Sequence, residues 1–366
     1  MTVNAGFPAI ENHLAQLGVS FITDIQSEGK GTANANTYFL SAGDRLYMID
    51  AACGKDRLRK ITAYLQGRSC DLLVTHTHLD HSANSGAVLS GNSKAVFHPR
   101  AAAKLGCLQR NYTEITPAMI NTFGVKGFFE RTGMLSPAMI AILLRLENFS
   151  PRFFNFLLKR YASLLCRSNI GAIHAPHHNV QFLDYHGCRE MAFGGTAFNG
   201  WDLGDGIFAL DTPGHQDDHL AFYLPDKKIM FAGDLISFLN PNDLLDGCIK
   251  DTNDGLEKML RLAQAGAIEM LATGHVLPII GSNNVLAYIR SIKEQHDEIF
   301  STVAAIISDC PDQHDFQAII ERVYDYDSEL MRKVLKINYP RSVSFIDVYV
   351  YLYLQEYVWG ELNGTD

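Results

Sequence analysis

The stretch Thr75-His-Thr-His-Leu-Asp-His81 decides how the rest of this sequence is interpreted, because it places three histidines and one carboxylate within six residues. It follows a short apolar run that predicts a buried strand. Histidines at positions i and i+2 of an extended chain point the same way, so His76 and His78 can converge on one metal ion. Asp80 and His81 lie just beyond and can turn toward a second ion. Imidazole and carboxylate ligands suit zinc, and they also allow manganese or iron.

Three distant segments share another pattern, in which an apolar run ends in glycine and then in a possible metal ligand. They are Asp211-Thr-Pro-Gly-His215, Phe231-Ala-Gly-Asp234 and Ala272-Thr-Gly-His275. Glycine at the end of a strand lets the backbone turn sharply and approach a neighbour closely. A lone Gly-His pair usually belongs to a loop, but three strand ends that each deliver a ligand favour one shared metal site.

The runs around these motifs predict alternating strands and helices. The hairpin pattern is carried by residues 37–40 and 46–49, the helical pattern by 55–66, and the next strand by 71–75. Strand, helix, strand in this order implies a parallel sheet covered by helices, which is the α/β class. Further strands are expected at 207–210, 219–224, 228–231 and 268–273, with an amphipathic helix over 253–265.

The segment from about residue 100 to 189 differs in composition from the rest. Thr116, Ser136 and Ser150 each precede a proline, which is the pattern of a helix start, and very apolar runs follow them. We expect three helices over residues 114–168 that lie over the metal edge as a lid, with a dimer interface as the alternative. The phenylalanines at 153, 154 and 156 either pack between helices, which is the more common role, or line the substrate pocket. From residue 284 to the end the pattern is again helical.

The motif H-x-H-x-D-H, followed in order by T-P-G-H, G-D and G-H, resembles the metallo-β-lactamase superfamily. The resemblance covers roughly residues 20–99 and 190–282 and implies an αββα sandwich with two metal ions at one edge. It implies a first site formed by His76, His78 and His215, a second formed by Asp80, His81 and His275, and Asp234 as a ligand that bridges both ions. The catalytic domain would span residues 1–282, with the helical insertion at about 100–189. A helical domain, 283–366, would follow and resembles a winged-helix-like tail.

The bridging aspartate narrows the expected activity. True zinc β-lactamases do not carry it, so the pattern is more similar to glyoxalase II-like thioesterases, lactonases, phosphodiesterases and metal-dependent ribonucleases. Lactonases often place a tyrosine three residues later, where this chain has Ser237. We predict a dinuclear metal-dependent hydrolase of a thioester or lactone, in which Asp80 or Asp234 orients the attacking hydroxide and carries its proton. A phosphodiesterase or ribonuclease is the alternative, supported by the tail, and a non-enzymatic metal-containing sensor is a third hypothesis.

The composition limits the partners of the chain. A net charge of −9 over 366 residues gives no broad cationic field, so we expect a small-molecule substrate and disfavour nucleic acid. No apolar stretch reaches the ~18 residues of a membrane span, and the first residues carry no secretory signal. Seven scattered cysteines without a C-x-x-C motif fit reduced thiols, so the predicted location is cytoplasmic. A homodimer is left open.

Two further groups of histidines have both a structural and a functional interpretation. His219 lies close to His215 in sequence. It either orients a metal ligand without binding the metal itself or is an ordinary strand histidine. The cluster formed by His174, His177 and His178 flanks Pro176, which is more typical of an exposed turn than of a substrate contact.

Overall fold

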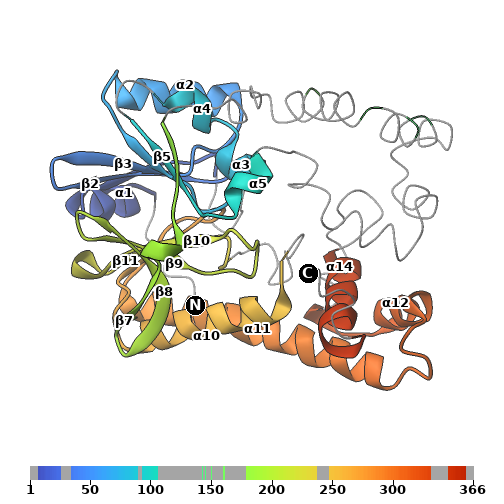
Figure 1. Cartoon of the computed structure of the whole chain (residues 1–366). Helices are drawn as coiled ribbons and strands as arrows, with labels where there is room; N and C mark the ends of the chain where they lie inside the picture. The colour runs from blue at the N-terminus through green and yellow to red at the C-terminus, as the bar shows by residue number, and fades with distance from the viewer. Residues whose placement is uncertain are drawn as a thin grey trace.

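The computed structural model describes residues 7–25, 34–89, 93–105, 179–236, 247–330 and 345–359, and the single residues 142, 145, 150 and 160. Two β-sheets pack face to face, and helices cover the outer face of each sheet (Figure 1). This is the predicted αββα sandwich. A group of helices follows it at the C-terminal end, as expected.

The first sheet, sheet A, joins antiparallel and parallel strands. Its order is β1 (Val19–Ile22), β2 (Thr37–Ala42), β3 (Arg45–Ile49), β4 (Asp71–Leu73), β5 (Ala95–Phe97) and β6 (Val180–Phe182). The strands β1, β2 and β3 are antiparallel, whereas β3 to β6 are parallel. The strand β6 falls inside the range predicted for the insertion and pairs with β5, so the described chain returns to the sandwich earlier than residue 189.

The second sheet, sheet B, is mostly an antiparallel meander. Its order is β13 (Ile279–Ile280), β12 (Met270–Thr273), β11 (Ile229–Gly233), β10 (Leu220–Leu224), β9 (Ile207–Asp211), β8 (Thr196–Gly204) and β7 (Arg189–Phe193). Only the β11–β12 pair among these is parallel. Because β9, β11 and β12 run in one direction, their carboxyl ends lie at the same edge of the sheet.

Helices cover each sheet on the side away from the other sheet. On sheet A these are α2 (Lys55–Leu65), α3 (Leu79–Ser82), α4 (Ser85–Val88) and α5 (Ala101–Leu105); on sheet B they are α10 (Ile249–Gln264) and the first half of α11 (Ser282–Ser308). The remaining helical elements are α1 (Phe7–Gln16), η2 (Tyr185–Gly187), η3 (Pro225–Lys227), α12 (Phe316–Asp325), α14 (Phe345–Tyr353) and the π-helical turn η4 (Leu354–Val358). The predicted helix at 253–265 is α10, which begins four residues earlier.

Among the described residues, four apolar clusters hold these layers together, and one of them belongs to the C-terminal helices. The cluster between the sheets includes Phe222 and Phe231, and each sheet shares another cluster with its own helices. The fourth cluster joins the second half of α11 to α12, α14 and η4. Since α11 contributes to both the sheet-B cluster and the fourth cluster, one helix connects the sandwich to the C-terminal helices. The boundary that the sequence suggests at 282/283 falls at the start of this helix.

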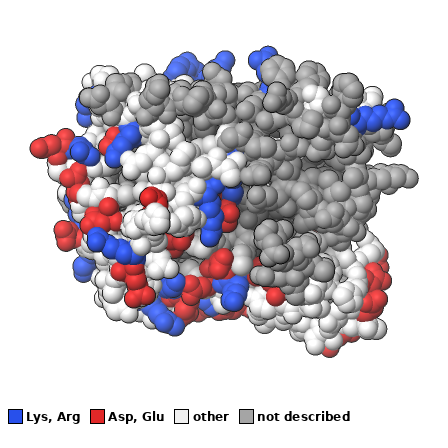
Figure 2. All heavy atoms as spheres, in the orientation of Figure 1, with Lys and Arg blue, Asp and Glu red and all other residues white. Residues whose placement is uncertain are grey.

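Most of the predicted insertion lies outside the described residues, and so do the expected lid helices, the three phenylalanines and the cluster of His174, His177 and His178. None of the described helices is long and apolar enough to cross a bilayer. The described part of the face in Figure 2 carries acidic and basic side chains side by side. That surface resembles a solvated face more than a field of one sign.

Candidate metal centre

The candidate ligands lie where strands of both sheets end at one edge of the sandwich. His76 and His78 follow β4 of sheet A, and Asp80 and His81 lie in α3 directly beyond them. From sheet B, the loop after β9 carries His215, the end of β11 carries Asp234, and the end of β12 carries His275. The hydrogen bond from Leu220 N to Thr75 O, 2.7 Å long, joins the two sheets at this edge. The fold therefore brings together residues that lie far apart along the chain.

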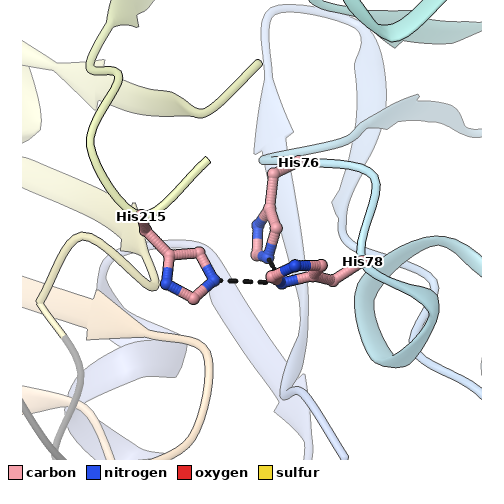
Figure 3. A group of neighbouring side chains, drawn as sticks. All are labelled: His76, His78 and His215. Atoms are coloured by element: carbon pink, nitrogen blue, oxygen red, sulfur yellow. Dashed lines mark hydrogen bonds between the residues drawn. The ribbon is translucent and has the colours of Figure 1, made fainter. Parts of the chain in front are cut away.

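Three imidazoles from the two sheets face one another at the first group of candidate ligands (Figure 3). The Nδ1 atom of His78 lies 3.0 Å from His76 Nε2 and 3.0 Å from His215 Nε2. One ring nitrogen cannot pair by a single proton with two other ring nitrogens. A cation between them satisfies all three lone pairs, and a tetrahedral zinc site with Zn–N near ~2.05 Å has ligand atoms about 3.3 Å apart.

The second group places carboxylates among the imidazoles. His275 Nε2 lies 3.4 Å from His81 Nε2 and 3.3 Å from Asp80 Oδ2. Asp234 Oδ2 lies 2.9 Å from His275 Nε2, 3.2 Å from His81 Nε2 and 3.9 Å from His215 Nε2, so this oxygen borders both groups. The other oxygen, Asp234 Oδ1, is buried and has no hydrogen-bond partner within the described part of the chain. This donor set fits divalent cations at two neighbouring positions.

The electrostatics of the two groups differ. Burial alone would raise the pKa of Asp80, but attraction by His81 and His275 holds it at about 2. Burial also disfavours charge on His275, yet Asp234 and Asp80 raise its pKa to about 10. Burial, together with neighbouring imidazoles, keeps the pKa of His76 well below its usual range. The second group therefore attracts positive charge, and His76 stays neutral with a free lone pair, as metal binding requires.

A buried carboxylate behind the candidate ligands is a residue that the sequence analysis missed. Asp50 follows β3, and its Oδ2 accepts hydrogen bonds from His81 Nδ1 and Thr75 Oγ1, both at 2.8 Å. Its Oδ1 accepts from Thr75 N, also at 2.8 Å. A carboxylate in this position orients an imidazole and makes its other nitrogen a better ligand. The signal was an aspartate ending the apolar run 46–49, but it had no histidine neighbour to mark it.

His219 supports the centre from sheet B, which favours the first of its two interpretations. Its Nε2 accepts hydrogen bonds from the backbone N–H groups of Asp234 and Leu235, at 3.1 and 3.3 Å. A Cβ atom at Gly233, where φ is +51°, would lie 2.5 Å from that same Nε2. A Cβ at Gly274 would lie 2.1 Å from Asp234 Oδ1. Close approach thus explains the glycines of both strand-end motifs.

All seven predicted ligands are brought together, and each belongs to a group whose ligand atoms lie within 4.8 Å of one another. These are His76, His78, Asp80, His81, His215, Asp234 and His275. The position that follows Asp234 by three residues, Ser237, lies outside the described residues, so the tyrosine position of the lactonases is untested. The class of protein that these features define is a two-sheet sandwich with a candidate metal centre of His and Asp residues at one edge.

Comparison with known proteins agrees with this class. Residues 31–116 match the family model of the metallo-beta-lactamase superfamily. A hydroxyacylglutathione hydrolase of Bartonella tribocorum is 38% identical over 56 residues, which cover 15% of this chain and 22% of that protein. One from Rhizobium meliloti is 27% identical over 104 residues, covering 27% and 39%. The matched stretches thus span well under half of these curated relatives.

A solved structure extends the likeness over the whole fold. A metallo-beta-lactamase family protein from Thermus thermophilus aligns over 93% of both chains with a TM-score of 0.51 and 20% identity. At this identity the likeness concerns the fold alone. The fold therefore agrees with the family-model match, which makes residues 31–116 of this chain similar to the metallo-beta-lactamase superfamily.

Proposed function

We propose that this protein is a dinuclear metal-dependent hydrolase that cleaves an ester-like bond, a thioester or a lactone, in a small and partly apolar molecule. The observation that carries the proposal is the position of Asp234 Oδ2, which borders two groups of ligand atoms. One group is His76, His78 and His215, and the other is Asp80, His81 and His275. Zinc suits this donor set best, and manganese or iron is compatible with it.

Bound divalent cations supply Lewis acidity, which lowers the pKa of nearby water toward ~7 and polarises the scissile carbonyl. The chain's own residues divide the remaining work. Asp234 is buried and shared between the two groups, so its role is to hold them in register. Asp80 has a side chain that is 30% exposed, so it can reach substrate and solvent and is the better carrier of a proton. Asp50 fixes the orientation of His81.

The ester-like substrate class has two supports. The curated relatives are named as hydrolases of hydroxyacylglutathione, which is a thioester. The net charge of −9 opposes long polyanions, which need a cationic surface to bind. A phosphodiester or RNA substrate is the competing class, and a metal-containing sensor without turnover is the third. The experiment below separates all three.

A substrate panel on metal-replete protein tests the proposal. The panel holds a glutathione thioester, an acyl-homoserine lactone, bis(p-nitrophenyl) phosphate and single-stranded RNA, with turnover measured per metal pair. We expect the thioester or the lactone to be cleaved at a rate that depends weakly on salt. Cleavage of RNA alone, with a steep loss as salt rises, would replace the first proposal with the second. No turnover of any substrate by protein with both metals bound would favour the sensor.

The organisation and partners are proposals of the same kind. We propose a catalytic domain over residues 1–282 and a helical domain over 283–366, with α11 shared between them. A small molecule is the proposed partner, and light scattering on purified protein at several concentrations tests whether the chain forms a homodimer.

A further inference from the structure

The start of α10 is capped by a residue from the far end of the chain. Cys248, at the N-cap position, makes no side-chain cap bond to the helix. Instead, the carboxylate of Glu356 accepts hydrogen bonds from the backbone N–H groups of Ile249 and Lys250, at 2.8 and 3.1 Å. The first N–H groups of a helix have no partner inside the helix and carry its positive dipole end. The Glu356 carboxylate therefore replaces the missing cap.

The surroundings of Glu356 hold it in this place. It lies in the π-helical turn η4, which is closed by a 2.7 Å hydrogen bond from Trp359 N to Leu354 O. Trp359 Nε1 in turn donates to Gln313 O at 3.0 Å. Ile249 is fully buried in the same apolar cluster as Leu354. Single π-helical turns are rare and concentrate at functional sites. The fourth apolar cluster thus fixes both the Glu356 carboxylate and the start of α10, which this carboxylate caps.

The same helix start touches the loop that carries His215. Cys248 N donates to Gly214 O at 2.8 Å. A Cβ atom at Gly214 would lie 2.6 Å from Thr252 Cα, and one at Gly247 would lie 1.8 Å from Gly214 O. These approaches leave no free space between the first turn of α10 and the residue before His215. A shift of the helix start must therefore move the loop.

We propose that Glu356 is a positioning residue for the candidate metal centre, holding His215 in place through the first turn of α10. This rests on the proposed function, because it requires a metal at His76, His78 and His215. Its effect falls on that first site, since the second group of ligands comes from α3 and from the end of β12. The C-terminal helices thereby help to position a candidate metal ligand.

Metal retention by the holoenzyme tests the proposal. Wild-type and variant proteins are dialysed against graded dipicolinate, and the remaining metal is measured by elemental analysis. We expect Glu356→Ala to lose one metal at about 3–10-fold lower chelator. This is less than the ~10–100-fold effect of removing a direct partner of a ligand, because Glu356 reaches His215 only through the helix start and Gly214. Glu356→Gln keeps an oxygen acceptor and should lie between the two. Glu298→Ala removes an exposed glutamate of α11 and should match wild type.

A double-mutant comparison separates positioning from general destabilisation. In a His215→Ala background, Glu356→Ala should change metal retention no further, whereas in a His275→Ala background it should keep its full effect. Equal effects in both backgrounds would overturn the proposal. If Glu356→Ala does not fold, Gly247→Ala disturbs the same contact with Glu356 intact and should weaken the same metal; unchanged retention there would also overturn it. Wild-type protein that binds no metal refutes the proposed function itself, whereas unaffected variants of a two-metal protein refute this inference alone.

Discussion

Histidine is buried in two regions of this protein, in opposite surroundings. The first region is the metal edge, the edge of the sandwich where the seven candidate ligands lie. There, His76, His81 and His215 are nearly inaccessible to solvent, and each has ring nitrogens within hydrogen-bond distance of other polar atoms. In the C-terminal helices, His296 of α11 is 1% exposed, and neither ring nitrogen has a hydrogen-bond partner in the described structure. Its neighbour is the ring of Tyr349, whose hydroxyl is equally unpaired.

The difference shows how to distinguish a candidate ligand-binding site from polar groups that are buried only because the side chains around them pack closely. Burying polar groups costs free energy in both regions. At the metal edge the polar atoms converge on common points, so one cation can offset the cost for several of them at once. At His296 they do not converge, and no ligand group is found there among the described residues. Convergence, not burial or an altered pKa, marks the functional region.

The largest effect is expected from removing the carboxylate oxygen that lies between the two groups of candidate ligands. Asp234→Ala removes the carboxylate that borders both groups, so both sites lose a ligand. We expect bound metal to fall from about two equivalents to one or fewer, and turnover to fall on the order of 10³-fold. Elemental analysis and initial rates measure the two quantities. Full activity with both metals retained would show that Asp234 is not the bridging ligand.

A smaller effect is expected from Asp50, which lies behind the candidate ligands and accepts a hydrogen bond from His81. Asp50→Asn keeps the size of the side chain but replaces one acceptor with a donor that faces His81 and Thr75. We expect the affinity for one metal to fall about 10–100-fold, measured by chelator competition. The matched control is Asp71→Asn at the start of β4, where the carboxylate accepts from Lys94 N. Equal affinities of the Asp50 and Asp71 variants would contradict the positioning role.

The sequence predicted which side chains the fold brings together at this edge, because each candidate ligand follows an apolar run that ends in a local motif. The hairpin at 37–49 and the helix at 55–66 were also predicted, since their periodicity is local. The hairpin β7–β8 was missed, although Gly194-Gly195 is a turn signal at its centre. Its first strand is at the sheet edge with mostly exposed residues, so no alternation of buried positions revealed it.

Contacts between distant segments could not be predicted. The pairing of β5 with β6 joins segments about 85 residues apart, and β6 has only Val180 partly buried, so its three residues carry no pattern. Asp50 and Glu356 have hydrogen-bond partners that only the folded chain brings near. Motifs predict which side chains can bind, whereas the residues that position them depend on tertiary packing.

The pH dependence of stability tests whether His296 in the C-terminal helices is buried without a polar partner. Burial lowers the pKa of His296 to about 4 from 6.5, so the unfolded chain takes up a proton first as the pH falls. The contribution is therefore absent above pH 6.5 and becomes destabilising between 6.5 and about 4. By pH ~5 it should cost about 2 kcal/mol.

Urea unfolding at pH ~7 and pH ~5 measures this contribution. The fluorescence of Trp359 reports on the C-terminal helices when the other tryptophan is removed by Trp201→Phe. In that background His296→Leu should lose less stability between the two pH values than the parent. His186→Gln, at an exposed histidine of η2, should behave as the parent does. Identical pH dependence of His296→Leu and the parent would show that His296 is charged or solvated in the folded protein.

The smallest effect comes from two tyrosine hydroxyls, one in each region. Tyr38 lies beside the metal edge, where its hydroxyl donates to Thr273 O at 2.9 Å, and the ring is buried. Tyr349 is equally buried, but its hydroxyl has no partner among the described residues. Removing the Tyr38 hydroxyl takes away the shorter of two hydrogen bonds to Thr273 O, which also accepts from Asn36 Nδ2 at 3.3 Å. Removing an unpaired hydroxyl instead relieves a desolvation cost.

Tyr38→Phe should therefore destabilise the protein by about 1–2 kcal/mol, and Tyr349→Phe should be neutral or stabilising by up to ~1 kcal/mol. Urea midpoints with unchanged m-values measure both changes at one pH. The pair is matched in residue type, burial and atoms removed, so the sign of the difference depends on the hydrogen bond alone. A loss for Tyr349→Phe as large as that for Tyr38→Phe would mean that its hydroxyl is bonded after all, and that the C-terminal helices pair their buried polar atoms as the metal edge does.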